Sequence, residues 1–124
     1  ADGGPHIQRA VENRIPIALH AHGDNVEEWK RFSATFSDNY PLILTHQTPG
    51  ELEGMVNVGG FTDGDRAICL ALACGAPPTS IELKGFKTDD VGKWSGVTDK
   101  AIKLEKLQWM EKIIQYLGYG EQIG

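Results

Sequence analysis

The sequence predicts an α/β fold in which helices pack on both faces of a mostly parallel sheet. Four short apolar or alternating runs, each bounded by Gly, Pro, Asn or Asp, are typical of buried strands. Segments with helical patterning lie between and around these runs. Alternation of this kind favours parallel strands joined by helical crossovers. The length of 124 residues fits a single domain covering residues 1–124.

In the first half of the chain, helices and strands are predicted in turn. A helix over residues 5–13 is followed by a strand over residues 15–21, an apolar run that leads into two histidines. A second helix is predicted over residues 25–36, because Asp24 and Glu27 have the spacing of a capping box at its start. A second strand is predicted over the apolar residues 41–45.

The second half repeats this pattern and ends in a long helix. Strands are predicted over residues 55–58 and 80–83, with a helix over residues 63–74 between them. That helix has capping-box spacing at Thr62 and Asp65, and Gly75 stands at its end. The final helix is predicted over residues 101–117, with Gly118 as its C-terminal cap. Its predicted inner stripe comprises Ile102, Leu107, Met110, Ile113, Ile114 and Leu117.

The composition excludes several classes of partner. Twelve basic and seventeen acidic residues give a net charge of −5, which opposes binding to nucleic acid or anionic lipid. The acidity suits metal cations, or a polyanionic substrate that arrives paired with one. No apolar run approaches the roughly 18 residues of a membrane span, so a cytoplasmic protein is predicted. Cys69 and Cys74 match neither a redox nor a zinc spacing and are interpreted as reduced core residues.

The first candidate site is the turn over residues 20–25, His-Ala-His-Gly-Asp-Asn, between a strand and a helix. Ligands of open α/β sheets bind at such turns. Strand alternation places His20 and His22 on one face, so a metal site on the two histidines is one hypothesis. The alternatives are that Asp24 caps its helix and that the histidines are hydrogen-bonded core residues.

The second candidate site is the turn over residues 59–66, Gly-Gly-Phe-Thr-Asp-Gly-Asp-Arg. Paired glycines allow the backbone to approach a ligand closely, and the start of the next helix offers N–H groups to a phosphate. Asp63 and Asp65 suit Mg²⁺ bound between carboxylates and phosphate, and Arg66 suits a phosphate oxygen. The alternative is a capping box that serves only the helix.

Together these residues resemble a known enzyme family, the archaeal type of 6-hydroxymethyl-7,8-dihydropterin pyrophosphokinase. The family is related in fold to the catalytic domain of thiamin pyrophosphokinase, so the resemblance implies a Rossmann-like sheet. The segments that carry the resemblance are residues 20–25, 57–67, 83–86, 92–95 and 103–107.

The resemblance implies Mg²⁺-dependent transfer of the terminal diphosphate of ATP to the hydroxymethyl group of a reduced pterin, with release of AMP. This reaction belongs to folate or methanopterin biosynthesis. The acids implied in catalysis and metal binding are Asp24, Asp63 and Asp65, with Arg66 as a catalytic cation. The residues implied in nucleotide or substrate binding are Asn25, Gly59, Gly60, Thr62, Lys84 and Lys93.

The chain departs from the family at its start. Relatives are longer and carry a TDLDG-like acidic strand end ahead of this region, with which only Asp2-Gly3-Gly4 is in register. We therefore expect Asp2 to be the last acid of a metal site whose first part is absent. The chain alone is then expected to bind Mg·ATP weakly and to release little AMP.

Two other classes of function stay open on the residues alone: a His/Asp metal-dependent hydrolase and a noncatalytic ligand-binding fragment. Zinc content would identify the hydrolase, and AMP release would identify the diphosphokinase. The residues do not distinguish a pterin acceptor from another hydroxymethyl heterocycle such as thiamin. They also leave open whether the chain forms a homo-oligomer.

Overall fold

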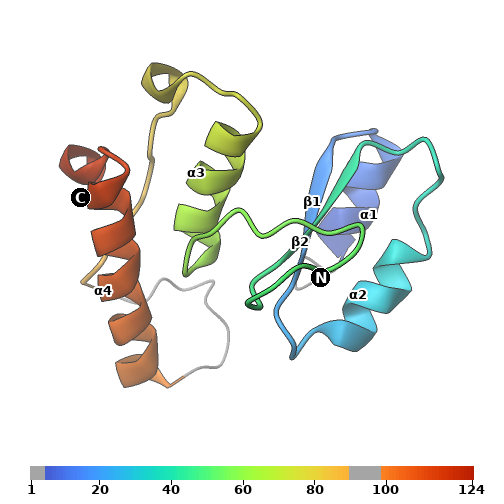
Figure 1. The fold of residues 1–124 in the computed structure, drawn as a ribbon, viewed down its shortest axis with the longest axis horizontal. Coiled ribbons are helices and arrows are strands. Elements are labelled where there is room, and N and C mark those ends of the chain that lie inside the picture. The colour runs from blue at the N-terminus through green and yellow to red at the C-terminus, as the bar shows by residue number, and fades with distance from the viewer. Residues whose placement is uncertain (1–4, 90–98) are drawn as a thin grey trace. The chain divides into compact units, whose positions relative to one another are not determined.

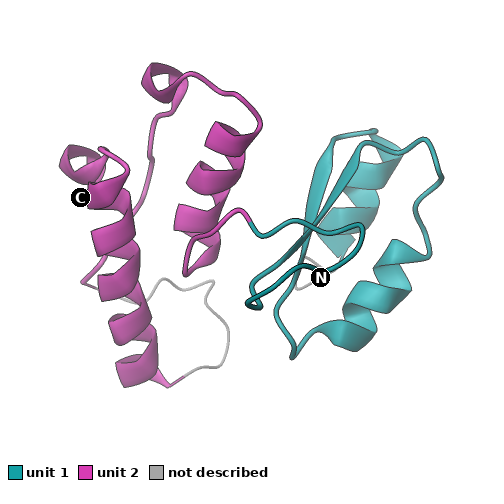
Figure 2. Cartoon of the chain, viewed as in Figure 1, with its two compact units in different colours: residues 1–57 teal, residues 58–124 magenta. Residues whose placement is uncertain are grey.

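The computed structural model describes residues 5–89 and 99–124. The chain divides into two compact units, residues 1–57 and residues 58–124 (Figure 2).

The first unit contains two helices and two parallel strands. In chain order these are α1 (Pro5–Glu12), β1 (Ile17–Ala21), α2 (Val26–Ser33) and β2 (Leu42–His46) (Figure 1). The strands pair in parallel, with Leu19 of β1 opposite Leu44 of β2. Leu19 is only 1% exposed, so the middle of β1 forms the core of this unit. The prediction of two strands and two helices in this region is confirmed.

The predicted strand over residues 55–58 is reduced to one residue pair. Val56 forms a parallel bridge with Thr45, and in this bridge the Val56 N–H donates to the Leu44 carbonyl at 2.9 Å. The His46 N–H donates in turn to the Val56 carbonyl at 3.1 Å. Thr45 and Val56 are the one residue pair recorded between β2 and the 55–58 segment. β2 therefore pairs with β1 on one edge and with Val56 on the other.

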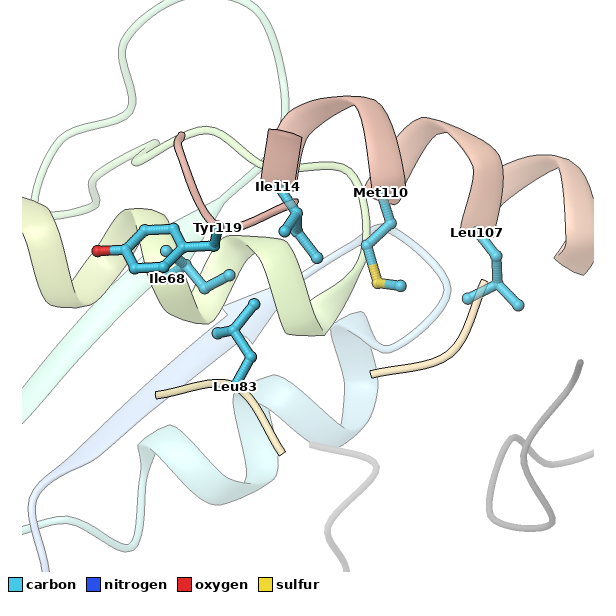
Figure 3. Close-up of a cluster of buried hydrophobic side chains, with 6 residues drawn as sticks. All are labelled: Ile68, Leu83, Leu107, Met110, Ile114 and Tyr119. Carbon is cyan, nitrogen blue, oxygen red and sulfur yellow. The ribbon is translucent and has the colours of Figure 1, made fainter. Parts of the chain in front are cut away.

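The second unit packs two helices around one apolar cluster. They are α3 (Asp63–Ala73) and α4 (Lys100–Tyr116), with short 3₁₀ turns at η1 (Pro78–Ser80) and η2 (Gly120–Gln122). Figure 3 shows the cluster side chains lying together, from α3, α4, the segment after η1 and the C-terminal end. The buried members are Ile68, Leu83, Leu107, Met110, Ile114 and Tyr119.

The predicted ends of the helices in this unit are confirmed. Gly75 and Gly118 follow α3 and α4 with φ of +90° and +89°, the left-handed conformation expected at a helix C-terminus. Four of the six residues of the predicted apolar stripe lie in or against the cluster. The other two are Ile102, which is 54% exposed, and Ile113, which is partly buried outside the cluster, while Leu104 packs against it instead.

The predicted strand over residues 80–83 is wrong. Within the described residues this segment pairs with no strand, and it is held instead by side chains near the end of α4. The Leu83 N–H donates to Gln122 Oε1 at 2.8 Å, and the Tyr119 hydroxyl donates to the Pro78 carbonyl at 2.8 Å. Leu83 is buried in the cluster, so its apolar character reflects packing against α4.

The structure confirms an α/β fold with a small parallel sheet. The Rossmann-like topology, with helices on both faces, and the single domain stay predictions. Across residues 5–89 and 99–124, no helix has both the length and the apolar character that a membrane crossing requires.

Candidate functional site

The turn that follows β1 is closed by a buried side-chain amide. Asn25 is 3% exposed, and its Oδ1 accepts the His22 N–H at 3.0 Å. Its Nδ2 donates to the His20 carbonyl at 2.8 Å. Asn25 is also the N-cap residue of α2, so the prediction that Asp24 caps this helix is wrong. Asp24 precedes the cap and its side chain is exposed.

His20 is hydrogen-bonded on both ring nitrogens. It lies opposite Thr45 in the parallel register, and its Nδ1 is 2.9 Å from Thr45 Oγ1. Its Nε2 is 3.2 Å from Gln47 Oε1. Because an amide oxygen only accepts, His20 donates through Nε2 in the contact with Gln47. The ring therefore fits the interpretation of a hydrogen-bonded histidine.

The hypothesis of a zinc site on the two histidines gains no support from the geometry. The rings of His20 and His22 lie 6.1 Å apart between centroids. Among residues 5–89 and 99–124, no three His, Cys, Asp or Glu side chains come together as a metal site. Thr45 and Gln47, the partners of His20, were not among the predicted site residues. The sequence signal for Thr45 is its place at the end of the second predicted strand, which parallel pairing sets beside the histidine-bearing end of the first.

The second candidate turn is organised around a buried carboxylate. The Asp65 side chain has no exposed surface. It accepts hydrogen bonds from the Phe61 N–H at 2.5 Å, the Thr62 N–H at 2.7 Å and the Thr62 hydroxyl at 2.5 Å. The predicted capping box between Thr62 and Asp65 is confirmed. In this conformation both donors of Thr62 therefore bind Asp65.

Gly60 allows this turn to approach the helix that follows it. Its φ is +89°, and a Cβ at this position would lie 2.5 Å from the Arg66 Cα and 2.6 Å from the Arg66 nitrogen. No side chain fits there, because backbone atoms cannot move aside as a flexible side chain can. Gly59 also has φ of +89°, but a Cβ on it would approach only Cys69 Sγ, at 4.0 Å. The steric requirement for glycine is therefore strict at residue 60.

An exposed acid and a buried cation meet at the start of α3. The Asp63 side chain is 95% exposed, whereas the Arg66 side chain is 9% exposed. The Arg66 guanidinium donates to Asp63 Oδ1 at 3.2 Å. Asp63 therefore presents a carboxylate to solvent, two residues from an acid of the same type that is fully buried.

The two cysteines of α3 and its C-terminal end have different surroundings. Burial raises the pKa of the Cys69 thiol, and the nearby Asp65 carboxylate raises it further. Cys74 is exposed, so the interpretation of both as core residues is wrong for Cys74. Both are unbridged thiols, as predicted.

The predicted cations and the upstream acid are only partly placed by the structure. Lys84 lies 3.5 Å from Glu82, and both side chains are exposed. Asp2 and Lys93 lie outside the described residues. Asp24 belongs to the first unit and Asp63 to the second. Their meeting at one edge of a sheet therefore stays a prediction.

Comparison with known proteins tests the resemblance directly. The chain is 35% identical to the 6-hydroxymethyl-7,8-dihydropterin pyrophosphokinase of Pyrococcus furiosus, over 86% of its own length. It is 30% identical to the enzyme of that name from Methanocaldococcus jannaschii and 33% identical to that from Methanothermobacter thermautotrophicus, each over 82% of its length. The chain is similar to these enzymes. The resemblance predicted from the five sequence segments is confirmed.

The similarity to the archaeal pyrophosphokinases covers only part of them. The chain spans about half the length of these curated relatives, between 44% and 46% of each. No protein-family model matches the chain. No solved structure matches it significantly.

The pyrophosphokinase resemblance implies Mg²⁺, and only some of the carboxylates in the two turns fit this ion. Mg²⁺ is commonly bound by one or two carboxylates together with substrate phosphates and water. The exposed carboxylates of Asp24 and Asp63 have this chemistry. The Asp65 carboxylate does not offer the same access, because it is buried and accepts three hydrogen bonds from its own turn.

Proposed function

We propose that this chain carries the phosphate-handling turns of a diphosphokinase that acts on a hydroxymethyl pterin. The proposal is supported chiefly by the similarity to three archaeal 6-hydroxymethyl-7,8-dihydropterin pyrophosphokinases over more than four fifths of this chain. The turn over residues 59–66 supports it independently, since it joins an exposed carboxylate to a cation at a helix start.

In the proposed reaction, the hydroxymethyl oxygen of the pterin attacks the β-phosphorus of ATP. A bond forms between this oxygen and the β-phosphorus, and the bond from that phosphorus to the oxygen bridging the α- and β-phosphates breaks. AMP leaves with the bridging oxygen, and the hydroxyl proton passes to solvent. Transfer of this kind depends on positioning and on stabilisation of charge more than on a strong base.

We assign different roles to the two acids of the second turn. Asp63 is proposed to bind the metal ion that accompanies ATP, because its carboxylate is exposed. Asp65 is proposed to shape the turn, because its three hydrogen bonds hold Phe61 and Thr62 in place. Mg²⁺, when bound, would offset the negative charge of the transferred diphosphate.

The remaining backbone donors of this turn suit a phosphate. The Thr62 N–H and Phe61 N–H already bind Asp65, so a phosphate would meet the N–H groups of Asp63 and Gly64 in the first turn of α3. Arg66 adds a fixed positive charge beside them. Gly59 and Gly60 are proposed to keep the backbone close to the ligand.

The first unit is proposed to contribute Asp24 as a further metal ligand. Asn25 is proposed to act by holding the turn, since both ends of its amide are bonded to backbone. Lys84, Lys93 and Asp2 stay proposed contributors to charge balance and metal binding. ATP and a reduced pterin are the proposed substrates, and a cytoplasmic location is proposed with them.

The test is AMP release from ATP in the presence of Mg²⁺ and 6-hydroxymethyl-7,8-dihydropterin. It is run on this chain and on a longer chain that restores the upstream acidic segment of the relatives. We expect little AMP from the shorter chain and pterin-dependent AMP from the longer one. In the longer chain, Asp63→Asn is expected to lower the rate about 100-fold or more, with little change in thermal stability.

Several outcomes would contradict the proposal. AMP release that does not depend on the pterin would indicate a hydrolase, and stoichiometric zinc in protein purified without added metal would favour the His/Asp class. Ligand binding without turnover in either chain would favour a noncatalytic fragment. An unchanged rate in Asp63→Asn would remove that acid from the site. Full activity of the shorter chain would show that the upstream segment is not needed.

A further inference from the structure

Two aromatic side chains lie exposed beside the second turn. Phe61, in the turn itself, is 48% exposed, and Trp109 of α4 is 47% exposed. Their ring centroids are 6.1 Å apart and the ring planes are tilted by 38°. The Lys112 ammonium lies 4.3 Å from the centroid of the Trp109 ring. These three side chains are called the aromatic platform below.

The platform is held in place by the buried parts of this unit. The Phe61 N–H donates to the Asp65 carboxylate, which fixes the backbone from which the Phe61 ring extends. Trp109 precedes Met110, which is 5% exposed in the apolar cluster. A Cβ on Gly64 would lie 3.5 Å from Met110 Sδ and 2.7 Å from the Phe86 ring. Because Gly64 has no side chain, α4 approaches the first turn of α3 closely at this point.

Large exposed aromatic rings in a fixed position suit a planar ligand. A flat heteroaromatic ring stacks on an aromatic face, with an attraction beyond that of the area it buries. A ring ligand placed here would have its substituents near the turn that holds Asp63 and Arg66. The Lys112 ammonium lies over one face of the Trp109 ring, so a stacked ligand would use the opposite face.

We propose that the aromatic platform binds the heterocycle of a substrate by stacking. This inference rests on the proposed function, which supplies two planar nitrogen heterocycles, the adenine of ATP and the pterin. Phe61 and Trp109 provide the stacking surface, and neither has a part in the roles assigned above to the acids and Arg66.

A partner helix is a less suitable occupant of this face. Ile102 and Tyr116, both exposed, lie seven residues on either side of Trp109, so the three residues share one stripe of α4. Of the four positions between them on that stripe, Glu105, Lys106 and Lys112 carry exposed charges and only the half-buried Ile113 is apolar, whereas a helix interface needs apolar residues. Ile102 and Tyr116 also each lie about 10.5 Å from Trp109 along the helix axis, which is too far for the Trp109 ring to contact both side chains.

The experiment follows the indole N–H signal of Trp109 by two-dimensional NMR in the full 124-residue chain. The signal is assigned by its loss in Trp109→Phe. The probes are ATP, inorganic tripolyphosphate and 6-hydroxymethylpterin, each added alone. We expect at least one ring-containing probe to shift the signal, while tripolyphosphate leaves it nearly unchanged. A shift with ATP identifies adenine as the stacked ring, and a shift with the pterin probe identifies the pterin.

Variants separate stacking from other roles of the same side chains. Trp109→Ala and Phe61→Leu are expected to weaken binding of the stacked probe by about tenfold to a hundredfold, whereas Trp109→Phe retains most of the affinity. Tyr116→Ala is the matched control, since it removes a ring that is 90% exposed on the same helix. It is expected to leave the affinity unchanged.

The outcomes distinguish this inference from the proposed function. If a ring probe binds elsewhere on the chain and the Trp109 signal and the variants are unaffected, the platform inference is wrong and the proposed function stands. If no probe shifts the Trp109 signal, the platform inference is overturned, and the proposed function is decided separately by the AMP-release test. If Trp109→Ala and Tyr116→Ala both dissociate an oligomer in sedimentation velocity, the stripe is a protein interface and the inference is wrong.

Discussion

Replacing Asp65 should cost far more stability than replacing Asp63, although the two acids are two residues apart. The Asp65 carboxylate is fully buried and accepts three hydrogen bonds, at 2.5, 2.7 and 2.5 Å. A hydrogen bond to a charged group contributes roughly 1.5 to 3 kcal/mol, and less where the donor can find water once its partner is gone. Phe61 and Thr62 lie near the surface, so we take about 1 to 1.5 kcal/mol for each bond.

Asp65→Ala should therefore destabilise the protein by about 3 to 4.5 kcal/mol. That is a large part of the roughly 5 to 15 kcal/mol that keeps a domain folded. Asp65→Asn should lie between this variant and the wild type, because the amide oxygen still accepts but the amide nitrogen opposes a backbone N–H. The free energy of unfolding is measured by urea denaturation followed by far-ultraviolet circular dichroism.

Asp63→Ala is the matched control for the loss of an acid from this turn. Its carboxylate is 95% exposed and pairs with the Arg66 guanidinium at 3.2 Å, so its loss should cost less than about 1 kcal/mol. An Asp65→Ala variant no less stable than Asp63→Ala would refute the argument that the buried carboxylate organises the turn. Lower activity in both variants, with lower stability only in Asp65→Ala, is the expected pattern.

Three further predictions follow from other contacts. Gly60→Ala should lower the melting temperature much more than Gly59→Ala, because of the two only a Cβ at Gly60 would clash with backbone, 2.5 Å from the Arg66 Cα. Equal losses would indicate that the positive φ of both residues matters and the clash does not. Cys74 should react with iodoacetamide before Cys69, because Cys74 is exposed and the raised pKa of Cys69 leaves less of its thiol as thiolate. The labelling rate of Cys69 should keep rising at higher pH, and faster labelling of Cys69 than of Cys74 would contradict this. Tyr40→Phe should lower the free energy of unfolding in urea by about 1 kcal/mol, because the Tyr40 hydroxyl contacts the backbone carbonyls of Ala10 and Ile15. An unchanged free energy would show that water replaces the hydroxyl.

The helices could be predicted from the sequence because their signals are local. The start of α3 is marked by the spacing of Thr62 and Asp65, and its end by Gly75. The predicted start at residue 63 is the observed one, and the predicted end at residue 74 differs by one residue. A capping box and a C-terminal glycine act within a few residues, so no distant contact is needed to recognise them.

Two of the strands could not be predicted reliably, because pairing depends on a partner elsewhere in the chain. Residues 55–58 and 80–83 are both short and apolar, yet only Val56 pairs, and Leu83 binds a glutamine side chain instead. An apolar run indicates that a segment packs against other parts of the chain, but it does not indicate which parts.

The candidate site shows the same limit for acids. Asp63 and Asp65 are the same residue type in the same turn, and the sequence pattern predicted a common role for them. Their burial is opposite in the structure, with Asp63 exposed and Asp65 enclosed. The capping-box spacing was the signal that could have separated them, because it points to Asp65 alone.

The side-chain bonds within the two turns also bear on the entropy of ligand binding. Asn25 joins backbone groups three and five residues away, and Asp65 joins groups three and four residues away. Each turn is thus ordered by the chain itself when the protein folds. A ligand that binds a loop already held in one conformation loses less affinity to ordering than one that must immobilise a disordered loop. Loosening either turn by mutation should therefore make the binding entropy less favourable, even where every group that touches the ligand is unchanged.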